Sequence, residues 1–270
     1  MNTISKILQK KRDNSIRALI PFVTAGYPNI DLSIEAILML DKRGADIIEL
    51  GIPYSDALAD GPLIQEASRT ALNNGIYVDE VLCILDKLLF KVNAAIVIFT
   101  YYNPILVRGL NCFISEISQR GVKGLIIPDL PIEEMDYLID LCKHFNIELI
   151  LFIAPTSSKD RINNIISKAP GCVYLVSSTG VTGIRNFVSN DMITTSNYIA
   201  SKTDKLLMLG FGISLPNHIS NISKSNCTID GIVVGSAFTR ILAGYTSNND
   251  LAIIEQLGYL CEKMKQATCS

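Results

Sequence analysis

The sequence has few of the patterns that mark metal, nucleotide or Schiff-base chemistry. Its only two histidines, His144 and His218, have no metal-ligand spacing, so packing or surface roles are expected for both. No GxxxxGK[ST] or GxGxxG motif is present, which excludes the usual fingerprints of nucleoside triphosphate and dinucleotide binding. A lysine at the end of an apolar run is also missing, since Lys205 begins its run, and this argues against a Schiff-base aldolase.

An excess of charge of one sign and a long hydrophobic run are absent as well. The 24 Lys and Arg residues nearly balance the 26 Asp and Glu residues and are scattered, which argues against nucleic acid or an anionic membrane as a partner. Proline, asparagine or charge breaks each apolar run before the roughly 20 residues that a transmembrane helix needs. Because 49% of the residues are hydrophobic, the chain can bury a large core. We expect a small molecule or another protein as its partner.

The seven cysteines form no CxxC pair, their number is odd, and most lie in apolar segments. This favours free thiols in a reducing compartment, either the cytoplasm or, for an organelle-encoded protein, the plastid stroma. The first residues, MNTISKILQKKRDNS, lack an apolar signal core. Ile4, Ile7 and Leu8 instead form a helical stripe, so we expect a structural helix that closes one end of the fold.

Apolar runs and helix-period segments alternate regularly along the whole chain. The runs contain no polar alternation, which is typical of strands buried on both faces. Segments such as LSIEAILMLDKRG and DRINNIISKA lie between them and have helical periodicity. About eight such units without a linker predict one (β/α)8 TIM-barrel domain over residues 1–270, with an extra N-terminal helix, rather than a doubly wound sheet. The eight runs begin at Ala18, Ala45, Ala94, Gly124, Glu148, Cys172, Lys205 and Gly231.

Glycine-rich turns directly follow the last three runs. GVTG ends at Gly183, GFGIS includes Gly212, and GSAFTRIL begins at Gly235. Glycine allows backbone N–H groups to approach a phosphate closely, and the late loops of a (β/α)8 barrel frequently bind phosphate. Each turn alone is weak evidence, because such a turn is more often an ordinary tight turn. Together, at these positions, they predict a phosphate site.

Two carboxylates stand out in the stretch IIELGIPYSDALADGP, residues 47–62. Residues alternate in direction along a strand, so Glu49 should point into the barrel mouth if Ile48 and Leu50 pack against helices. Apolar surroundings should raise the pKa of Glu49, which suits a group that both gives and takes a proton. Asp60, nearer water on a loop, should stay ionised and balance positive charge. The alternative is a structural ion pair for Glu49 and a solvated turn for Asp60.

The stretch IELGIPYSDALADGP resembles the signature of the tryptophan synthase alpha subunit family. PFVTAGYP, the IIPDLPIEE turn around Asp129, YLVSSTGVTG, GFGIS and VVGSAF follow in the order of that family over nearly the whole chain. The resemblance implies a (β/α)8 barrel with Glu49 and Asp60 as the catalytic pair. It also implies a substrate site formed by Phe22, Tyr174, Thr182, Gly183, Phe211, Gly212, Gly235 and Ser236.

The same resemblance implies a lyase of tryptophan biosynthesis that cleaves indole-3-glycerol phosphate to indole and glyceraldehyde 3-phosphate. No cofactor is implied for this chain. Indole would pass to a beta subunit that carries pyridoxal phosphate, in an alpha2-beta2 tetramer. Thr182 is expected to bond Asp60 when the mouth closes. A stand-alone indole-releasing lyase, another phosphosugar-binding barrel such as a phosphoribosyl isomerase, and a non-catalytic activator of a partner remain the alternatives.

Overall fold

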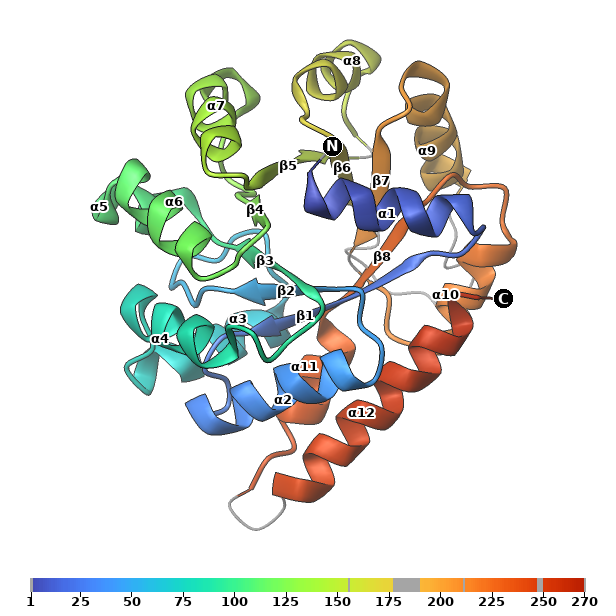
Figure 1. Ribbon diagram of the computed structural model, residues 1–270. Helices are drawn as coiled ribbons and strands as arrows, with labels where there is room; N and C mark the ends of the chain where they lie inside the picture. The colour runs from blue at the N-terminus through green and yellow to red at the C-terminus, as the bar shows by residue number, and fades with distance from the viewer. Residues whose placement is uncertain (1, 155, 177–189, 211, 247–249, 270) are drawn as a thin grey trace.

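Eight parallel strands form a closed barrel in this computed structural model (Figure 1). They pair in chain order, and the last strand pairs with the first. This confirms the predicted (β/α)8 barrel. The structure describes residues 2–154, 156–176, 190–210, 212–246 and 250–269. The strands are β1 (Ala18–Thr24), β2 (Ile47–Gly51), β3 (Ala95–Phe99), β4 (Gly124–Ile126), β5 (Glu148–Ile153), β6 (Cys172–Val176), β7 (Leu206–Gly210) and β8 (Gly231–Val234).

Helices surround the barrel on its outside (Figure 1). Two helices, instead of the single one expected per unit, lie between β2 and β3 and again between β3 and β4, and two follow β8. The helices are α1 (Thr3–Asp13), α2 (Ile30–Lys42), α3 (Pro62–Asn73), α4 (Val78–Leu88), α5 (Tyr102–Arg108), α6 (Leu110–Gln119), α7 (Asp136–His144), α8 (Lys159–Lys168), α9 (Asn190–Lys202), α10 (Pro216–Lys224), α11 (Ser236–Leu242) and α12 (Asp250–Ala267).

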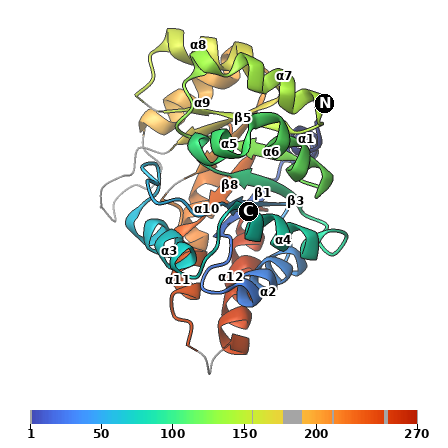
Figure 2. The ribbon, with the colours of Figure 1, turned by 90° about the vertical axis from the view of Figure 1, so that its left-hand side faces the viewer.

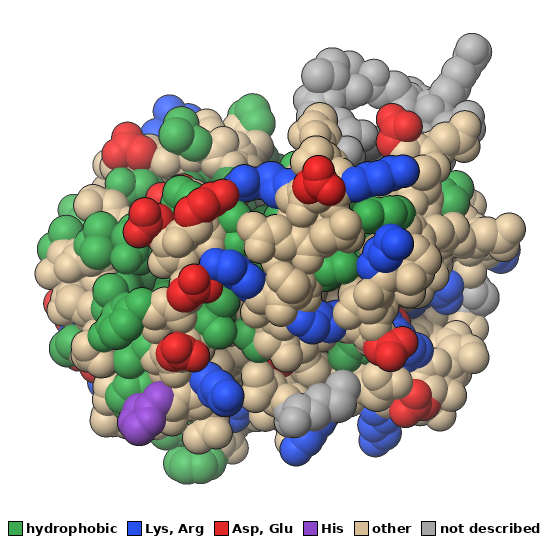
Figure 3. All heavy atoms as spheres, turned by 90° about the horizontal axis from the view of Figure 1, so that it is seen from above, with side chains coloured by type: hydrophobic (Ala, Val, Ile, Leu, Met, Phe, Trp, Pro, Cys, Tyr) green, Lys and Arg blue, Asp and Glu red, His purple; other side chains and the backbone are tan. Residues whose placement is uncertain are grey.

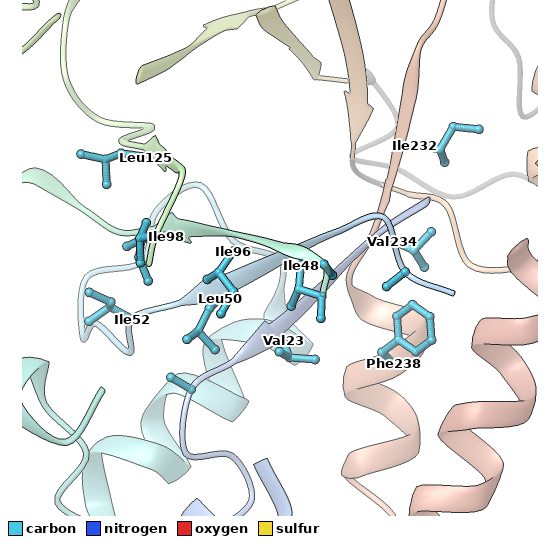
Figure 4. Packing of buried hydrophobic residues seen from close by; sticks show 14 of the residues in the cluster. Val23, Ile48, Leu50, Ile52, Ile96, Ile98, Leu125, Ile232, Val234 and Phe238 are labelled. Carbon is cyan, nitrogen blue, oxygen red and sulfur yellow. The ribbon is translucent and has the colours of Figure 1, made fainter. Parts of the chain in front are cut away.

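Side chains of β2 alternate between the barrel interior and the helical layer. Ile48, Leu50 and Ile52 belong to the core between strands and helices, where they pack with aliphatic side chains of neighbouring strands (Figure 4). Ile47 belongs to the separate cluster inside the barrel. The two-residue period therefore leaves Glu49 on the interior side, as the sequence predicts.

The N-terminal helix covers the end of the barrel at which the strands begin. Ile4 and Leu8 of α1 are fully buried in the interior cluster. Their side chains fill the space above the glycines that start β4 and β8. A Cβ added at Gly124 would lie 3.2 Å from Ile4, and one at Gly231 would lie 2.9 Å from Leu8. The expectation that this segment forms a helix closing one end of the fold is confirmed.

Ion pairs hold α1 to this end of the barrel. Lys11 lies 2.6 Å from Asp46, whose other oxygen accepts the backbone N–H of Leu19 at 2.8 Å. Arg12 forms a bidentate pair with the buried Asp230 at 2.7 and 2.6 Å. Figure 2 shows α1 and the segment that leads into α3 at opposite ends of the barrel, which leaves that opposite end open for a site.

The segment after β4 contains two helical elements. A short 3₁₀ turn, η1 (Ile132–Glu134), comes first, and α7 begins only at Asp136. Glu134 donates its backbone N–H to Pro131 at 3.0 Å, an i to i−3 bond that winds the first turn more tightly than an α-helix.

The described part of the chain contains no helix both long and apolar enough to cross a membrane. In Figure 3, acidic and basic side chains are interspersed over the face seen there and do not gather into a patch of one sign. This agrees with the near balance of charge in the sequence.

Candidate active site

A cavity of about 840 Å³ opens at the carboxyl ends of the strands, away from α1. Its walls combine aromatic side chains from the strand ends with carboxylates and with glycine turns from the loops. Active sites of (β/α)8 enzymes lie at this end of the barrel. The lining includes Phe22, Glu49, Asp60, Ile64, Phe99, Phe152, Tyr174, Gly212, Gly235, Ser236 and Arg240.

Glu49 lies at the apolar inner end of this cavity. Strand pairing places it between Phe22 of β1 and Val97 of β3, and its side chain is 1% exposed. Burial, reinforced by the charge of Asp60, raises the pKa of Glu49 to about 8. Its Oε1 has no hydrogen-bond partner among the described residues. A protonated carboxyl group whose oxygen lacks such a partner can donate its proton to a bound ligand.

Asp60 lies on the loop between β2 and α3 and is more enclosed than a solvated turn residue. The Tyr101 hydroxyl donates to Asp60 Oδ2 at 3.1 Å. Burial raises the pKa of Asp60 to about 6, and the bond from Tyr101 partly opposes that rise. Asp60 is therefore mainly ionised at neutral pH, as expected, although it is less accessible to water than the sequence suggested.

Two side chains, those of Tyr101 and Gln65, fix the loop that carries Asp60. Tyr101 accepts the backbone N–H of Ala59 at 3.0 Å on the same hydroxyl that bonds Asp60. Gln65, in the second turn of α3, donates from Nε2 to the carbonyl oxygens of Ala57 and Asp60 at 3.1 and 3.0 Å. Sequence reasoning missed both Tyr101 and Gln65, because neither belongs to a motif and both act across loops.

Four aromatic rings form the apolar wall of the cavity. Phe22 meets Phe99 edge-on with ring centroids 5.6 Å apart, and Phe152 lies 4.7 Å from Tyr174. Phe99 and Phe152 also meet edge-on at 6.3 Å. Such an enclosure suits a flat aromatic ligand. Phe22 and Tyr174 were predicted, whereas Phe99 and Phe152 were missed, although both stand at inward positions near the end of an apolar run.

The glycine turns line the same cavity. Gly212 has φ +78°, a conformation that favours glycine, and Gly235 and Ser236 begin the last βα turn. A Cβ at Gly235 would lie 3.3 Å from Ile64 and 3.4 Å from Phe22, so little space remains above that backbone. The structure thus brings three of the predicted phosphate-loop residues to the cavity that holds the carboxylates.

Three predicted site residues, Thr182, Gly183 and Phe211, lie outside the described residues. Within the described ranges, no group of three or more His, Cys, Asp or Glu side chains could hold a metal ion. The cavity holds two acids with separated pKa values, an aromatic wall and glycine turns whose backbone comes close to it. This arrangement can bind a phosphorylated aromatic molecule and transfer protons on it.

Comparison with known proteins agrees with this geometry. The family model described as tryptophan synthase alpha chain matches residues 8–269. The tryptophan synthase alpha chain of Gracilaria tenuistipitata var. liui is 58% identical over 98% of this chain and 96% of its own length. That of Rippkaea orientalis is 42% identical over 99% and 98%.

Solved structures agree as well. Mycobacterium tuberculosis tryptophan synthase superposes with a TM-score of 0.89 at 28% identity, covering 100% of this chain and 99% of that chain. Tryptophan synthase subunit alpha from Legionella pneumophila gives 0.86 at 30% identity, covering 99% and 98%. The chain therefore belongs to the tryptophan synthase alpha chain family and is a lyase that cleaves indole-3-glycerol phosphate to indole and glyceraldehyde 3-phosphate.

Proposed function

We propose that Glu49 and Asp60 carry out this cleavage, with the aromatic wall around the indole ring and the glycine turns around the phosphate. The observation that carries the proposal is the buried Glu49 carboxyl, whose Oε1 has no partner among the described residues and whose pKa burial raises to about 8. A carboxyl group in that state can donate a proton and then accept one.

The reaction is a retro-aldol cleavage that needs two proton transfers and no oxidant. Glu49 donates its proton to C3 of the indole ring, which forms a cationic indolenine. The resulting Glu49 carboxylate removes the proton from the hydroxyl on the attached carbon. As the C–C bond breaks, its electron pair returns to the ring to give indole, and the hydroxyl carbon becomes the aldehyde. Glu49 is protonated again, so it serves as both acid and base.

Asp60 stabilises the cation in this scheme. Its carboxylate, ionised above a pKa of about 6, accepts the indole N–H and balances the positive charge on the ring. The hydrogen bond from Tyr101 supports this role because it favours the ionised form and holds the side chain in place. Phe22 and Tyr174 would then contact the ring faces and edges, and Gly212, Gly235 and Ser236 would contact the phosphate.

The direct test is to supply indole-3-glycerol phosphate to the purified chain and to measure indole and glyceraldehyde 3-phosphate. Equal amounts of both products are expected for the retro-aldol reaction. If Asp60→Asn releases indole with the wild-type kcat, the proposed role of Asp60 is contradicted. Turnover of a phosphoribosyl substrate instead of indole-glycerol phosphate would favour the phosphosugar isomerase alternative.

The partner we propose is a beta subunit that carries pyridoxal phosphate, in an alpha2-beta2 tetramer. The names of the relatives support a partnership, since the Legionella protein is called a subunit alpha. Apolar side chains at the barrel mouth also support it. Leu58, on the loop after β2, is 90% exposed, and Val107 of α5 is 82% exposed. In this scheme the alpha chain needs no cofactor of its own.

We further propose that the protein works in a reducing compartment, the cytoplasm or the plastid stroma. All seven cysteines are free, and four of them, among them Cys172 inside the barrel, are buried. Burial raises the pKa of the Cys172 thiol well above its usual value, so it stays protonated and unreactive. Fractionation of the source cells with an antibody against the chain tests this proposal.

The phosphate assignment predicts a selective effect of Gly235→Val. Because a Cβ at Gly235 already comes within 3.4 Å of Phe22, a larger side chain must occupy the space above the backbone donors. We expect KM for indole-3-glycerol phosphate to rise about tenfold or more, the scale of one lost charge-assisted hydrogen bond. Binding of unphosphorylated indole should change less, because only the shift that the new side chain forces on Phe22 affects the indole ring. Equal weakening of both ligands would indicate general damage to the cavity.

The partnership predicts that added beta subunit accelerates the isolated chain. Docking that favours a closed mouth by about 1–3 kcal/mol would raise turnover roughly 5- to 150-fold. Val107→Asp should abolish this activation, because it places a charge among the apolar side chains at the mouth. It should leave the unactivated rate unchanged. The matched control is Phe90→Asp, an equally exposed apolar residue that precedes β3 at the opposite end, and it should be activated like wild type.

Two results would contradict this picture. A wild-type chain that is fast alone and does not respond to partner is a stand-alone lyase. Full activation of Val107→Asp would place the docking surface elsewhere.

A further inference from the structure

We propose that Asp129 is a positioning residue for the cleavage reaction, which acts through Tyr101 to hold Asp60 in the cavity. The inference rests on the proposed role of Asp60. It gives a function to the IIPD turn after β4, a motif that the catalytic scheme above does not use. Asp129 does not line the cavity, so its effect has to pass through other residues.

The first link runs from Asp129 to the start of α5. The backbone N–H of Tyr102 donates to Asp129 Oδ1 at 2.9 Å and to Oδ2 at 3.3 Å. The first N–H groups of a helix have no carbonyl partner within the helix, and the residue before α5, Tyr101, offers no side-chain cap. The carboxylate of Asp129 therefore supplies the cap from a neighbouring loop and fixes where α5 begins.

The second link runs from Tyr101 to Asp60. Tyr101 is the residue immediately before α5, so the cap on the Tyr102 N–H sets the direction of the Tyr101 ring. The ring is 3% exposed and stacks on Tyr54 with centroids 5.1 Å apart. Its hydroxyl accepts the N–H of Ala59 at 3.0 Å and donates to Asp60 Oδ2 at 3.1 Å. The two bonds hold Asp60 and the residue before it together.

The two links connect the ends of three adjacent strands. Asp60 follows β2, Tyr101 and Tyr102 follow β3, and Asp129 follows β4. Asp129 forms no ion pair with any described residue, so neutralising a neighbouring cation is not its role in the described part of the chain. Its carboxylate accepts the hydrogen bond from the Tyr102 N–H, and the position of the Tyr101 hydroxyl depends on that contact.

Several ionisable groups share the surroundings of Asp60. Glu49 approaches it from β2, Tyr101 from the end of β3, and Tyr174 from β6, while Arg240 of α11 lines the same cavity. Among these, the Tyr101 hydrogen bond lowers the pKa of Asp60. Loss of that bond should therefore move the acidic side of the pH–rate profile to higher pH, an effect that merely loosening the fold would not produce.

The test compares Asp129→Ala, Asp129→Asn and Tyr101→Phe with wild type. Tyr101→Phe removes only the hydroxyl, and Asp129→Asn keeps an acceptor oxygen for the Tyr102 N–H. We expect Asp129→Ala and Tyr101→Phe each to lower kcat about tenfold, with little change in KM, because neither substitution touches the glycine turns proposed for the phosphate. Both should shift the acidic limb to higher pH, and Asp129→Asn should keep most of the activity. Glu134→Ala, an exposed acid in the same connection, is the matched control and should behave like wild type.

The double variant Asp129→Ala/Tyr101→Phe decides between a shared and a separate role. Because both changes act on one link, the double variant should be no slower than Tyr101→Phe alone. Additive losses, or a slower Asp129→Ala enzyme with an unmoved acidic limb, would overturn the proposal while leaving the role of Asp60 intact. A wild-type kcat in Asp60→Asn would overturn both. Thermal unfolding of each variant shows whether lost activity comes from lost fold, and Tyr101→Phe supplies the pH test if Asp129→Ala does not fold.

Discussion

Glu49→Gln is expected to abolish nearly all cleavage while leaving the fold and the KM for indole-3-glycerol phosphate close to wild type. The amide keeps the shape of the carboxyl group but cannot shuttle a proton between C3 and the substrate hydroxyl. Loss of one general acid or base typically costs about 10²- to 10⁴-fold in rate, and in the proposed scheme a single group serves both steps. Steady-state indole release measures the effect. A variant that keeps more than about half of the wild-type kcat would rule out Glu49 as the acid and base.

The pH dependence of kcat tests the same assignment without a mutation. In the proposed scheme, Asp60 acts ionised and Glu49 enters the reaction protonated. The rate should therefore rise with pH through about 6, as Asp60 loses its proton, and fall through about 8, as Glu49 loses its own. The proposed scheme assigns the fall in rate at alkaline pH, the alkaline limb, to Glu49, so any residual activity of Glu49→Gln should lack it. An alkaline limb that persists in the variant would assign that titration to another group.

Glu148 provides a matched control, because it is a second buried glutamate inside the same barrel. It begins β5 at the end covered by α1, where the backbone N–H of Ser5 donates to its Oε2 at 3.1 Å. Glu148→Gln should lower the melting temperature by weakening the contact with α1. It should leave kcat and the alkaline limb unchanged, since Glu148 lies at the opposite end of the barrel from the cavity.

The sequence was sufficient to predict the strands and the direction of Glu49. In a closed parallel barrel each strand is buried on both faces, so β2 appears as an unbroken apolar run in which one charged residue is conspicuous. The two-residue period then sends Ile48 and Leu50 toward the helices and Glu49 inward. The same period, applied to the runs at β3 and β5, would have found Phe99 and Phe152.

The contacts around Asp60 could not be predicted in this way. Tyr101 bonds Asp60 across 41 residues of chain, and Tyr102 bonds Asp129 across 27. Such pairs depend on how neighbouring strand ends line up once the barrel has closed, and local periodicity carries no information about that. The enclosure of Asp60, and hence the rise of its pKa, has the same origin.

Gly210→Ala is expected to be the most destabilising single-methyl change in the active-site half of the barrel. Gly210 ends β7, and a Cβ there would lie 1.8 Å from the Tyr174 hydroxyl oxygen and 2.3 Å from Cζ of the same ring. Real carbon contacts do not come so close, so the ring has to move. Tyr174 is 2% exposed, with Phe152 packed 4.7 Å from its ring on one side and the cavity that it lines on the other. Overpacking of this kind costs about 1–3 kcal/mol of unfolding free energy, and sometimes more.

The displaced ring should also change the reaction. Tyr174 forms part of the aromatic wall, so a shift of the ring away from position 210 moves it into the space proposed for indole. We expect the KM for indole-3-glycerol phosphate to rise together with the loss of stability. Urea unfolding and steady-state kinetics on the same preparation measure the two effects.

A second substitution separates this clash from a general effect of a methyl group on β7. Leucine at position 174 lacks the atoms of the ring that meet the new Cβ, so Gly210→Ala should be far less harmful in a Tyr174→Leu background. Tyr174→Leu alone should destabilise the protein, because it leaves part of a buried ring's volume empty. The two changes together should therefore cost less than the sum of their separate effects, by about 1 kcal/mol or more, the coupling seen for residues in direct contact. Strict additivity would show that the ring of Tyr174 yields without cost and that the contact with Gly210 does not constrain the site.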